Sequence, residues 1–320
     1  MSIILSIIIP NYNGVEFLRT CLQSVFAEIT DVCEVVVVDD GSTDESVDVI
    51  QQTFSNALAS GKLKLISIEN SGPGEARNVG VKASCGTYIA FLDSDDFILP
   101  GFFERILAIL EENAPDIMQF SVLRVLDDRL TGQNIVPCHR TAEGLYDMDE
   151  VRADIFGVGK WFPFSRVFSR DIILKNPFPS ERVFYEDLLT LPFIFFQSFN
   201  IYLLPDHLIA YRDNPKGTTR NHKPDHARTM LDHFQRVSAL PPSVARDIML
   251  VQVARSIVFF TLELKLREMP LRDLRSQIRA LENKQVLASH LDGIDRFFLR
   301  FPLLYTAIDW ARKRLRRTKT

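Results

Sequence analysis

The chain has 320 residues, of which 46% are hydrophobic, and this is enough to build one large domain or two smaller ones. Its formal net charge of -4 gives no reason to expect nucleic acid as a partner, and its four cysteines contain no C-x-x-C pair that would predict a zinc or redox site. No uncharged apolar stretch is long enough to span a bilayer, and the N-terminus lacks the basic region and cleavage site of a secretory signal. We therefore expect a cytoplasmic protein.

The first hundred residues alternate between strand and helix patterns. Continuous apolar runs predict four buried strands, at residues 2–9, 34–38, 63–68 and 87–92. Helical spacing and a capping box predict three helices between them, at 15–29, from 42–45 onward and at 75–84. This order predicts an α/β fold with a Rossmann-like, mostly parallel sheet flanked by helices, in which ligands bind beyond the carboxyl ends of the strands.

Polar residues follow each predicted strand, at 11–14, 39–42, 70–78 and 93–96. In the last cluster, Asp93, Asp95 and Asp96 directly follow an apolar run. Three carboxylates at one sheet edge repel each other, which predicts a bound cation. Oxygen ligands suit Mg²⁺ or Mn²⁺, and these ions commonly also hold substrate phosphates.

Each of the other clusters has a structural alternative. Residues 11–14 could form an ordinary turn, and Asp40 could cap the following helix. Gly72 could serve only a backbone torsion, and Arg77 could form a surface ion pair. The convergence of four clusters on one edge favours a functional site.

The chain resembles the inverting, GT-A-fold glycosyltransferases of family 2. The resemblance covers residues 2–220 and rests on six segments, SIIIPNYNG, CLQSV, VVVVDDGSTD, NSGPGEARNVG, GTYIAFLDSDD with its D-x-D, and FYEDLLT. It implies a nucleotide-diphosphate sugar as donor, most simply a UDP-sugar, with Mn²⁺ or Mg²⁺ as cofactor. It also implies a role for each matching residue. Asp95 and Asp93 would hold the metal, and the donor nucleotide would contact Pro10, Tyr12, Asn13, Asp39, Asp40, Asn70, Gly72, Arg77, Asp93 and Ser94.

The second half is expected to bind the acceptor. Residues 116–125 predict a strand, and 127–147 read as a polar connection. The resemblance assigns Lys160, Trp161 and Arg212 to the acceptor side, and Trp161 could instead fill core. Glu186 and Asp187 precede an apolar helix, where they could complement the helix dipole. The resemblance favours Asp187 as the catalytic general base and Glu186 as its partner.

Beyond residue 225 the pattern becomes helical. We expect a catalytic domain at 1–225, with a nucleotide-sugar half at 1–115 and an acceptor half at 116–225, and a helical C-terminal extension at 226–320. The tail from 297 to 317 is aromatic first and basic last. It could lie at the surface of the inner membrane, which would make the protein peripheral, or pack on the protein or on a homodimer mate.

These observations predict an enzyme, a metal-dependent glycosyltransferase. It would move a sugar with inversion to a hydroxyl of a saccharide or lipid-linked saccharide, in surface or capsular polysaccharide or lipopolysaccharide biosynthesis. Two alternatives stay open. A sugar-phosphate nucleotidyltransferase would normally need a basic, glycine-rich loop after the first strand, and residues 11–14 contain no Lys or Arg. An inactive carbohydrate-binding homologue would not need the acidic clusters.

Overall fold

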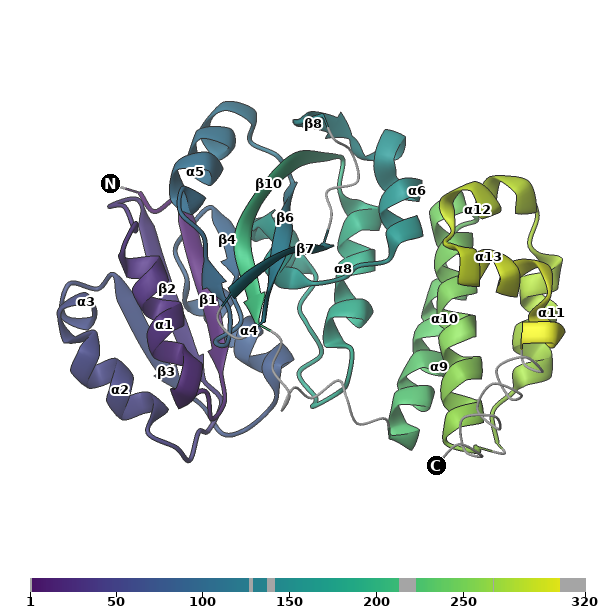
Figure 1. Cartoon of the computed structure of the whole chain (residues 1–320), viewed down its shortest axis with the longest axis horizontal. Helices are drawn as coiled ribbons and strands as arrows, with labels where there is room; N and C mark the ends of the chain where they lie inside the picture. The colour runs from purple at the N-terminus through teal and green to yellow at the C-terminus, as the bar shows by residue number, and fades with distance from the viewer. Residues whose placement is uncertain (1, 127–128, 137–141, 213–222, 267, 306–320) are drawn as a thin grey trace. The chain divides into compact units, whose positions relative to one another are not determined.

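The computed structural model describes residues 2–126, 129–136, 142–212, 223–266 and 268–305 (Figure 1). The chain forms two compact units. The first contains Met1–Glu150 and Trp161–Pro215, and the second contains Val151–Lys160 and Lys216–Thr320. The catalytic region 1–225 and the extension 226–320 expected from the sequence stay a proposal.

One mixed sheet organises the first unit. Its strands are β1 (Leu5–Asn11), β2 (Cys33–Asp39), β3 (Leu63–Ser67), β4 (Tyr88–Phe91), β5 (Phe97–Ile98), β6 (Ile117–Leu126), β7 (Arg129–Val136), β8 (Gly144–Asp147), β9 (Arg166–Ser169) and β10 (Asn200–Arg212). The order is β3-β2-β1-β4-β9-β6-β10-β5, with β7 paired to β6 and β8 to β10. The first four strands are parallel, as predicted, and β9 then pairs antiparallel with both β4 and β6. The α/β fold class is confirmed.

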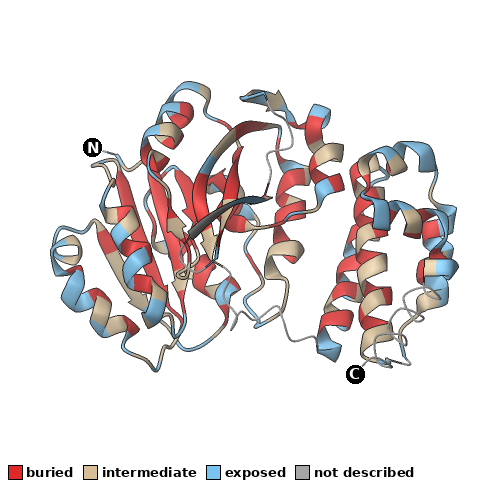
Figure 2. Cartoon of the chain, viewed as in Figure 1, coloured by how far each residue is buried: buried red, intermediate tan, exposed pale blue. Residues whose placement is uncertain are grey.

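Helices cover both faces of the parallel strands. The first unit contains α1 (Val15–Phe26), α2 (Ser46–Thr53), α3 (Ser55–Ala59), α4 (Pro73–Ala83), α5 (Phe102–Asn113), α7 (Arg170–Lys175) and α8 (Glu186–Gln197), a 3-10 turn η1 (Pro163–Ser165), and the start of α6 (Met148–Val158). Alternate residues of β1 point to opposite faces, so Ile7 and Ile9 join the core cluster with Leu18 and Leu22 of α1. On the other face, α4 approaches so closely that a Cβ on Gly80 would lie 2.3 Å from Ile8 Cγ2. The strands are therefore buried on both faces, as Figure 2 shows in red.

Two local predictions are wrong. Residues 127–147 are not merely a polar connection, because β7 pairs with β6 and β8 pairs with β10. β7 pairs with the strand directly before it and β8 with a strand distant in sequence, and neither strand has a strong apolar pattern of its own. The predicted capping box also fails, since α2 begins at Ser46 and the Ser42 hydroxyl accepts bonds from Asn11 Nδ2 and Asn13 N instead.

The second unit is helical. It contains most of α6 together with α9 (Pro224–Ser238), α10 (Val244–Glu263), α11 (Leu271–Ala280), α12 (Lys284–His290) and α13 (Gly293–Arg300). The helical pattern expected beyond residue 225 is confirmed in these helices, and α10 ends at Glu263, before Pro270. Gln252 of α10 donates to the carbonyls of Phe156 and Gly157, which ties the end of α6 to this bundle. None of the described helices is long and apolar enough to cross a membrane. The predicted basic tail lies largely in 306–320, outside the described residues.

Candidate active site

The first two strands end in a shared hydrogen-bond network. Asn11, at the end of β1, donates from Nδ2 to Asp39 Oδ1 at 3.0 Å, and the Ser42 amide donates to Asp39 Oδ2 at 3.1 Å. Asn13 lies at a φ of 50°, and its Oδ1 accepts from the Thr43 amide at 2.8 Å. Residues 11–14 are therefore more than an isolated turn, since they hold the loop after β2 in place.

Asp40 connects the second strand to the loop before α4. Its two carboxylate oxygens accept from the amides of Ser71 and Gly72 at 2.7 and 2.9 Å. It does not cap the helix that follows it in sequence. Gly72 has a φ of 97°, a region that residues with a side chain rarely adopt. Its backbone torsion and its bond to Asp40 together shape the start of α4.

Arg77 of α4 links the residues after β4 to the start of α8. Its guanidinium donates to Glu186 Oε1 at 2.7 Å and to Asp93 Oδ1 at 3.0 Å. The residue is 5% exposed, so the surface ion pair considered from the sequence is wrong. Burial opposes its charge, but Asp93 and Glu186 outweigh burial and raise the pKa of Arg77 above its ordinary value. A charged residue buried in this way fixes the two carboxylates at one distance from each other.

The residues after β4 concentrate negative charge. Burial, followed by Asp93 and Asp95, raises the pKa of Asp96 well above its ordinary value. Asp96 Oδ1 accepts from the Arg212 amide at 2.8 Å, while its buried Oδ2 has no hydrogen-bond partner among the described residues. Burial and these same three carboxylates also raise the pKa of the Cys21 thiol. An oxygen-rich site with excess negative charge fits Mn²⁺ or Mg²⁺, although no group of three acidic, Cys or His side chains with metal-binding geometry occurs among the described residues.

Asp187 lies in the first turn of α8 with a perturbed pKa. Its Oδ1 accepts from the Leu188 amide at 2.7 Å. Burial, and next the negative charge of Glu186, raise the pKa of Asp187 to about 7, although the Leu188 bond and the charge of Arg77 act in the opposite direction. Tyr185, just before the helix, has a φ of 64°, and such strain in a residue with a side chain is concentrated at functional sites. This carboxylate can therefore accept a proton near neutral pH.

Comparison with known proteins identifies the family. Residues 6–163 match the family described as Glycosyl transferase family 2. This region of the chain belongs to glycosyltransferase family 2. Among curated relatives, it is 27% identical to the uncharacterized glycosyltransferase EpsJ of Bacillus subtilis over 240 residues, which cover 73% of this chain and 67% of EpsJ. It is also 34% identical to the uncharacterized glycosyltransferase YibD of Escherichia coli, over 36% of this chain and only 33% of YibD.

Solved structures give the fold. The S. aureus TarS fragment 1–349, solved in complex with UDP-GlcNAc, matches with a TM-score of 0.70 at 20% identity, covering 96% of this chain and 89% of TarS. The mannosyltransferase PcManGT of Pyrobaculum calidifontis, solved with GDP-Man and Mn²⁺, matches with a TM-score of 0.54 at 16% identity, covering 96% and 86%. The predicted GT-A fold is confirmed.

The remaining donor residues of the family 2 region lie around the same edge. Pro10 is in β1, and the Tyr12 ring just beyond it is 48% exposed, so it is free to stack on a planar base. Asn70 accepts from Arg182 Nη1 at 3.0 Å. Ser94 stands between the acidic residues and is half-buried. Their roles in donor binding stay predictions.

The three predicted acceptor residues have different surroundings. Trp161 is 5% exposed and its ring packs edge-on against Phe195 at 5.5 Å, which favours the core alternative. Lys160 belongs to the second unit. Arg212 lies beside the acidic residues, where its Nε donates to the Asp95 carbonyl at 3.1 Å. In this structure, Arg212 therefore lies on the donor side of the site.

Three further residues were assigned no role from the sequence. Asn78 exchanges hydrogen bonds with the backbone of Phe178, one hundred residues away, and so joins α4 to the segment that leads into α8. Arg182 contacts Asn70 and packs on Gly72. Arg166 is 1% exposed, contacts the ring of Phe195, and burial lowers its pKa to about 9. Only Asn78 carried a signal, since it stands in the matched segment NSGPGEARNVG.

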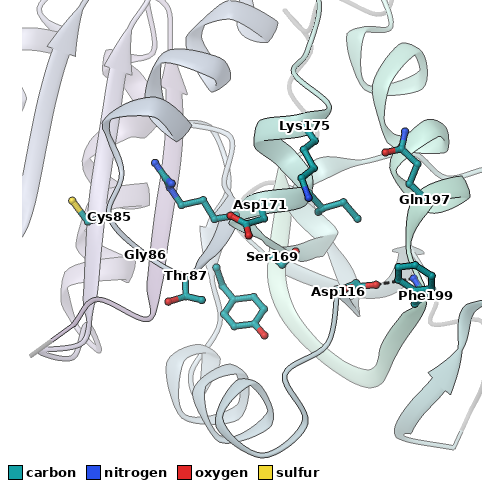
Figure 3. A pocket seen from close by; sticks show the side chains of 12 residues that line it. Cys85, Gly86, Thr87, Asp116, Ser169, Asp171, Lys175, Gln197 and Phe199 are labelled. Carbon is teal, nitrogen blue, oxygen red and sulfur yellow. Dashed lines mark hydrogen bonds between the residues drawn. The ribbon is translucent and has the colours of Figure 1, made fainter.

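A groove of about 550 Å³ lies elsewhere in the first unit (Figure 3). It is lined by residues at the start of β4 and just before β6, including Tyr88 and Asp116, and by Lys175 of α7. These strands begin there and end near the acidic cluster, so the groove is at the opposite edge of the sheet. It is not the candidate active site.

Proposed function

We propose that this protein transfers one sugar from a nucleotide-diphosphate donor to a hydroxyl group of a saccharide or lipid-linked saccharide, with inversion at the anomeric carbon. The observation that carries the proposal is the buried bridge from Asp93 through Arg77 to Glu186. It connects the acidic residues after β4 to the start of α8, where Asp187 has a pKa suited to a general base. Donor and acceptor chemistry would thus meet in one fixed arrangement.

The donor side would use the ends of the parallel strands. Asp39 and Asp40, already oriented by Asn11 and by the amides of Ser71 and Gly72, can each accept a further hydrogen bond from a base or ribose. We propose UDP as the nucleotide, and the support is that TarS, which shares the fold, was solved with UDP-GlcNAc. The donor sugar itself stays undefined.

A divalent cation fits the acidic residues, with Asp95 and Asp93 as the ligands we propose. When bound, it would neutralise negative charge on the diphosphate. The chain's own side chain, Asp187, would carry out the proton transfer. Asp187 Oδ1 is oriented by the Leu188 amide, which leaves Oδ2 to accept the proton of the acceptor hydroxyl. As that oxygen bonds to the anomeric carbon, the bond from this carbon to the diphosphate breaks, and the nucleoside diphosphate leaves with the electron pair.

The organisation and setting of the enzyme are also proposals. We propose that the half at 1–115 binds the donor and that 116–225 shapes the acceptor site. We propose a cytoplasmic reaction in surface polysaccharide biosynthesis, with a lipid-linked acceptor held at the membrane face.

Isothermal titration calorimetry tests the donor assignment. We expect UDP-sugars to bind in the presence of Mn²⁺, and we expect EDTA to remove that binding. Absence of heat with UDP-, GDP- and other nucleotide sugars in Mn²⁺ would refute the glycosyltransferase proposal. A nucleotidyltransferase would instead release pyrophosphate from a nucleoside triphosphate and a sugar phosphate, which the same preparation can be tested for.

A further inference from the structure

The two units carry opposite charge. By sequence, the first unit has 14 Lys and Arg against 30 Asp and Glu, a net charge of -16. The second unit has 23 Lys and Arg against 11 Asp and Glu, a net charge of +12. The modest charge of the whole chain therefore hides a strongly basic unit, and such a unit attracts anionic surfaces.

An apolar patch lies on this basic unit. It consists of Ile294, Phe301, Leu303 and Leu304, whose exposed fractions are 56, 43, 54 and 49%. Ile294 is in α13, and the other three follow directly after it. Phe297 adds a half-buried ring 5.5 Å from that of Phe301. Exposed apolar side chains gathered in one short segment mark an interaction surface.

The charges next to the apolar patch have the sign needed for an anionic partner. Arg296 and Arg300 of α13 are exposed, and the Arg300 guanidinium lies 5.4 Å from the centre of the Phe301 ring. Asp295, directly before Arg296, is buried and bonded to Arg255, so its negative charge is compensated inside the unit. Asp292, which caps the N-terminus of α13, is exposed and keeps its negative charge there. The sequence beyond the described residues adds six more basic residues and one acidic residue, Asp309.

We propose that the second unit docks on an anionic phospholipid surface through the apolar patch, with Arg296 and Arg300 facing the lipid headgroups. Apolar side chains enter the boundary between headgroups and acyl chains, while the arginines remain among the phosphates. Each basic side chain near such a surface strengthens binding by about five-fold. Apolar side chains alone or basic side chains alone give only weak attachment, so the two are needed together. This proposal does not depend on glycosyl transfer, because its residues lie outside the candidate active site.

Vesicle co-sedimentation of the full chain tests the proposal. We expect binding to phosphatidylcholine vesicles that contain phosphatidylglycerol, little binding to pure phosphatidylcholine, and weakening with added NaCl. The double variant Phe301→Ser/Leu304→Ser should lower the partition coefficient about ten-fold or more. Val286→Ser is the matched control, since Val286 is 46% exposed on α12 of the same unit and outside the patch. It should bind like the unmodified protein.

A second variant tests the charges. Replacing Arg296 and Arg300 by Gln should weaken anionic binding about 25-fold and flatten its salt dependence. Equal sedimentation of the Phe301/Leu304 variant and the unmodified protein would overturn the proposal, as would no binding to anionic vesicles. The protein could instead fail to bind vesicles but self-associate in light scattering, while the Phe301/Leu304 variant stays monomeric. In that case the patch is an interface between copies of the chain and the lipid proposal is wrong. Circular dichroism checks that each variant is folded.

Discussion

Replacing Glu186 by Gln should shift the acid limb of the pH–rate profile for sugar transfer, the range in which the rate rises with pH, to lower pH. The negative charge of Glu186 is, after burial, the largest cause that raises the pKa of Asp187 to about 7. Glu186 also accepts a bond from Arg77, so the substitution leaves that positive charge less compensated. Both changes stabilise an ionised Asp187 and lower its pKa.

The size of the effect follows from simple titration. With a pKa of about 7, about one Asp187 in eleven is ionised at pH 6 and about ten in eleven at pH 8, so the rate should rise about ten-fold. Loss of one neighbouring like charge lowers the pKa of a carboxyl group by roughly one unit, which corresponds to about 1.4 kcal/mol. The Gln variant should then be about half ionised at pH 6, and its rate should rise only about two-fold over the same interval.

The assay is the initial rate of nucleoside diphosphate release at saturating donor, measured across this pH range. The readout is the position of the acid limb, because the absolute rate can also change when Arg77 loses a partner. Glu181→Gln is the matched control, since Glu181 is exposed and lies on the segment before α8. An acid limb that stays in place or moves to higher pH in Glu186→Gln would refute the electrostatic reasoning.

Three further substitutions have defined outcomes. Asp187→Asn should cut transfer by about 10²–10⁴-fold with little change in donor affinity by calorimetry. An acid whose pKa is raised in the folded state lowers the stability of the protein as the pH rises from about 4 to about 7. The Asp187→Asn variant should therefore be more stable than the unmodified protein at pH 8, by on the order of 2–4 kcal/mol in urea unfolding. This gain should shrink toward pH 4. Arg77→Met leaves two carboxylates without their cation and should lower the free energy of unfolding by about 3–5 kcal/mol, and an unchanged urea midpoint would contradict the bridge. Gly80→Ala would press a Cβ on Ile8 and should cost about 1–3 kcal/mol, whereas Gly293→Ala, with nothing within 4 Å of the added Cβ, should cost far less.

Much of the donor half could be predicted from local pattern. Continuous apolar runs mark strands buried on both faces, and β1, β2 and β3 lie where those runs predict them. Since parallel strands end at the same edge, the polar residues after them had to meet, and the bonds of Asn11 to Asp39 and of Asp40 to Gly72 follow from that. A short-range sequence pattern is enough to predict this half, because the apolar runs predict the strands and their alternation with helices predicts that the strands are parallel.

The acceptor half depended on contacts that no local pattern reports. The strand β8 exists because β10, distant in sequence, supplies its hydrogen-bond partners, and Trp161 is buried because Phe195 of α8 packs against it.

Sequence alone determined the parallel strands, the polar residues at their ends and the carboxylate at residue 187. Only the tertiary structure decided that Arg77 joins Asp93 to Glu186, 109 residues further along the chain from Arg77, and that burial beside Glu186 raises the pKa of Asp187. The physical reason is that hydrophobic periodicity is encoded between near neighbours. Desolvation and charge pairing depend instead on which distant segments come together, and that is fixed only when the chain folds.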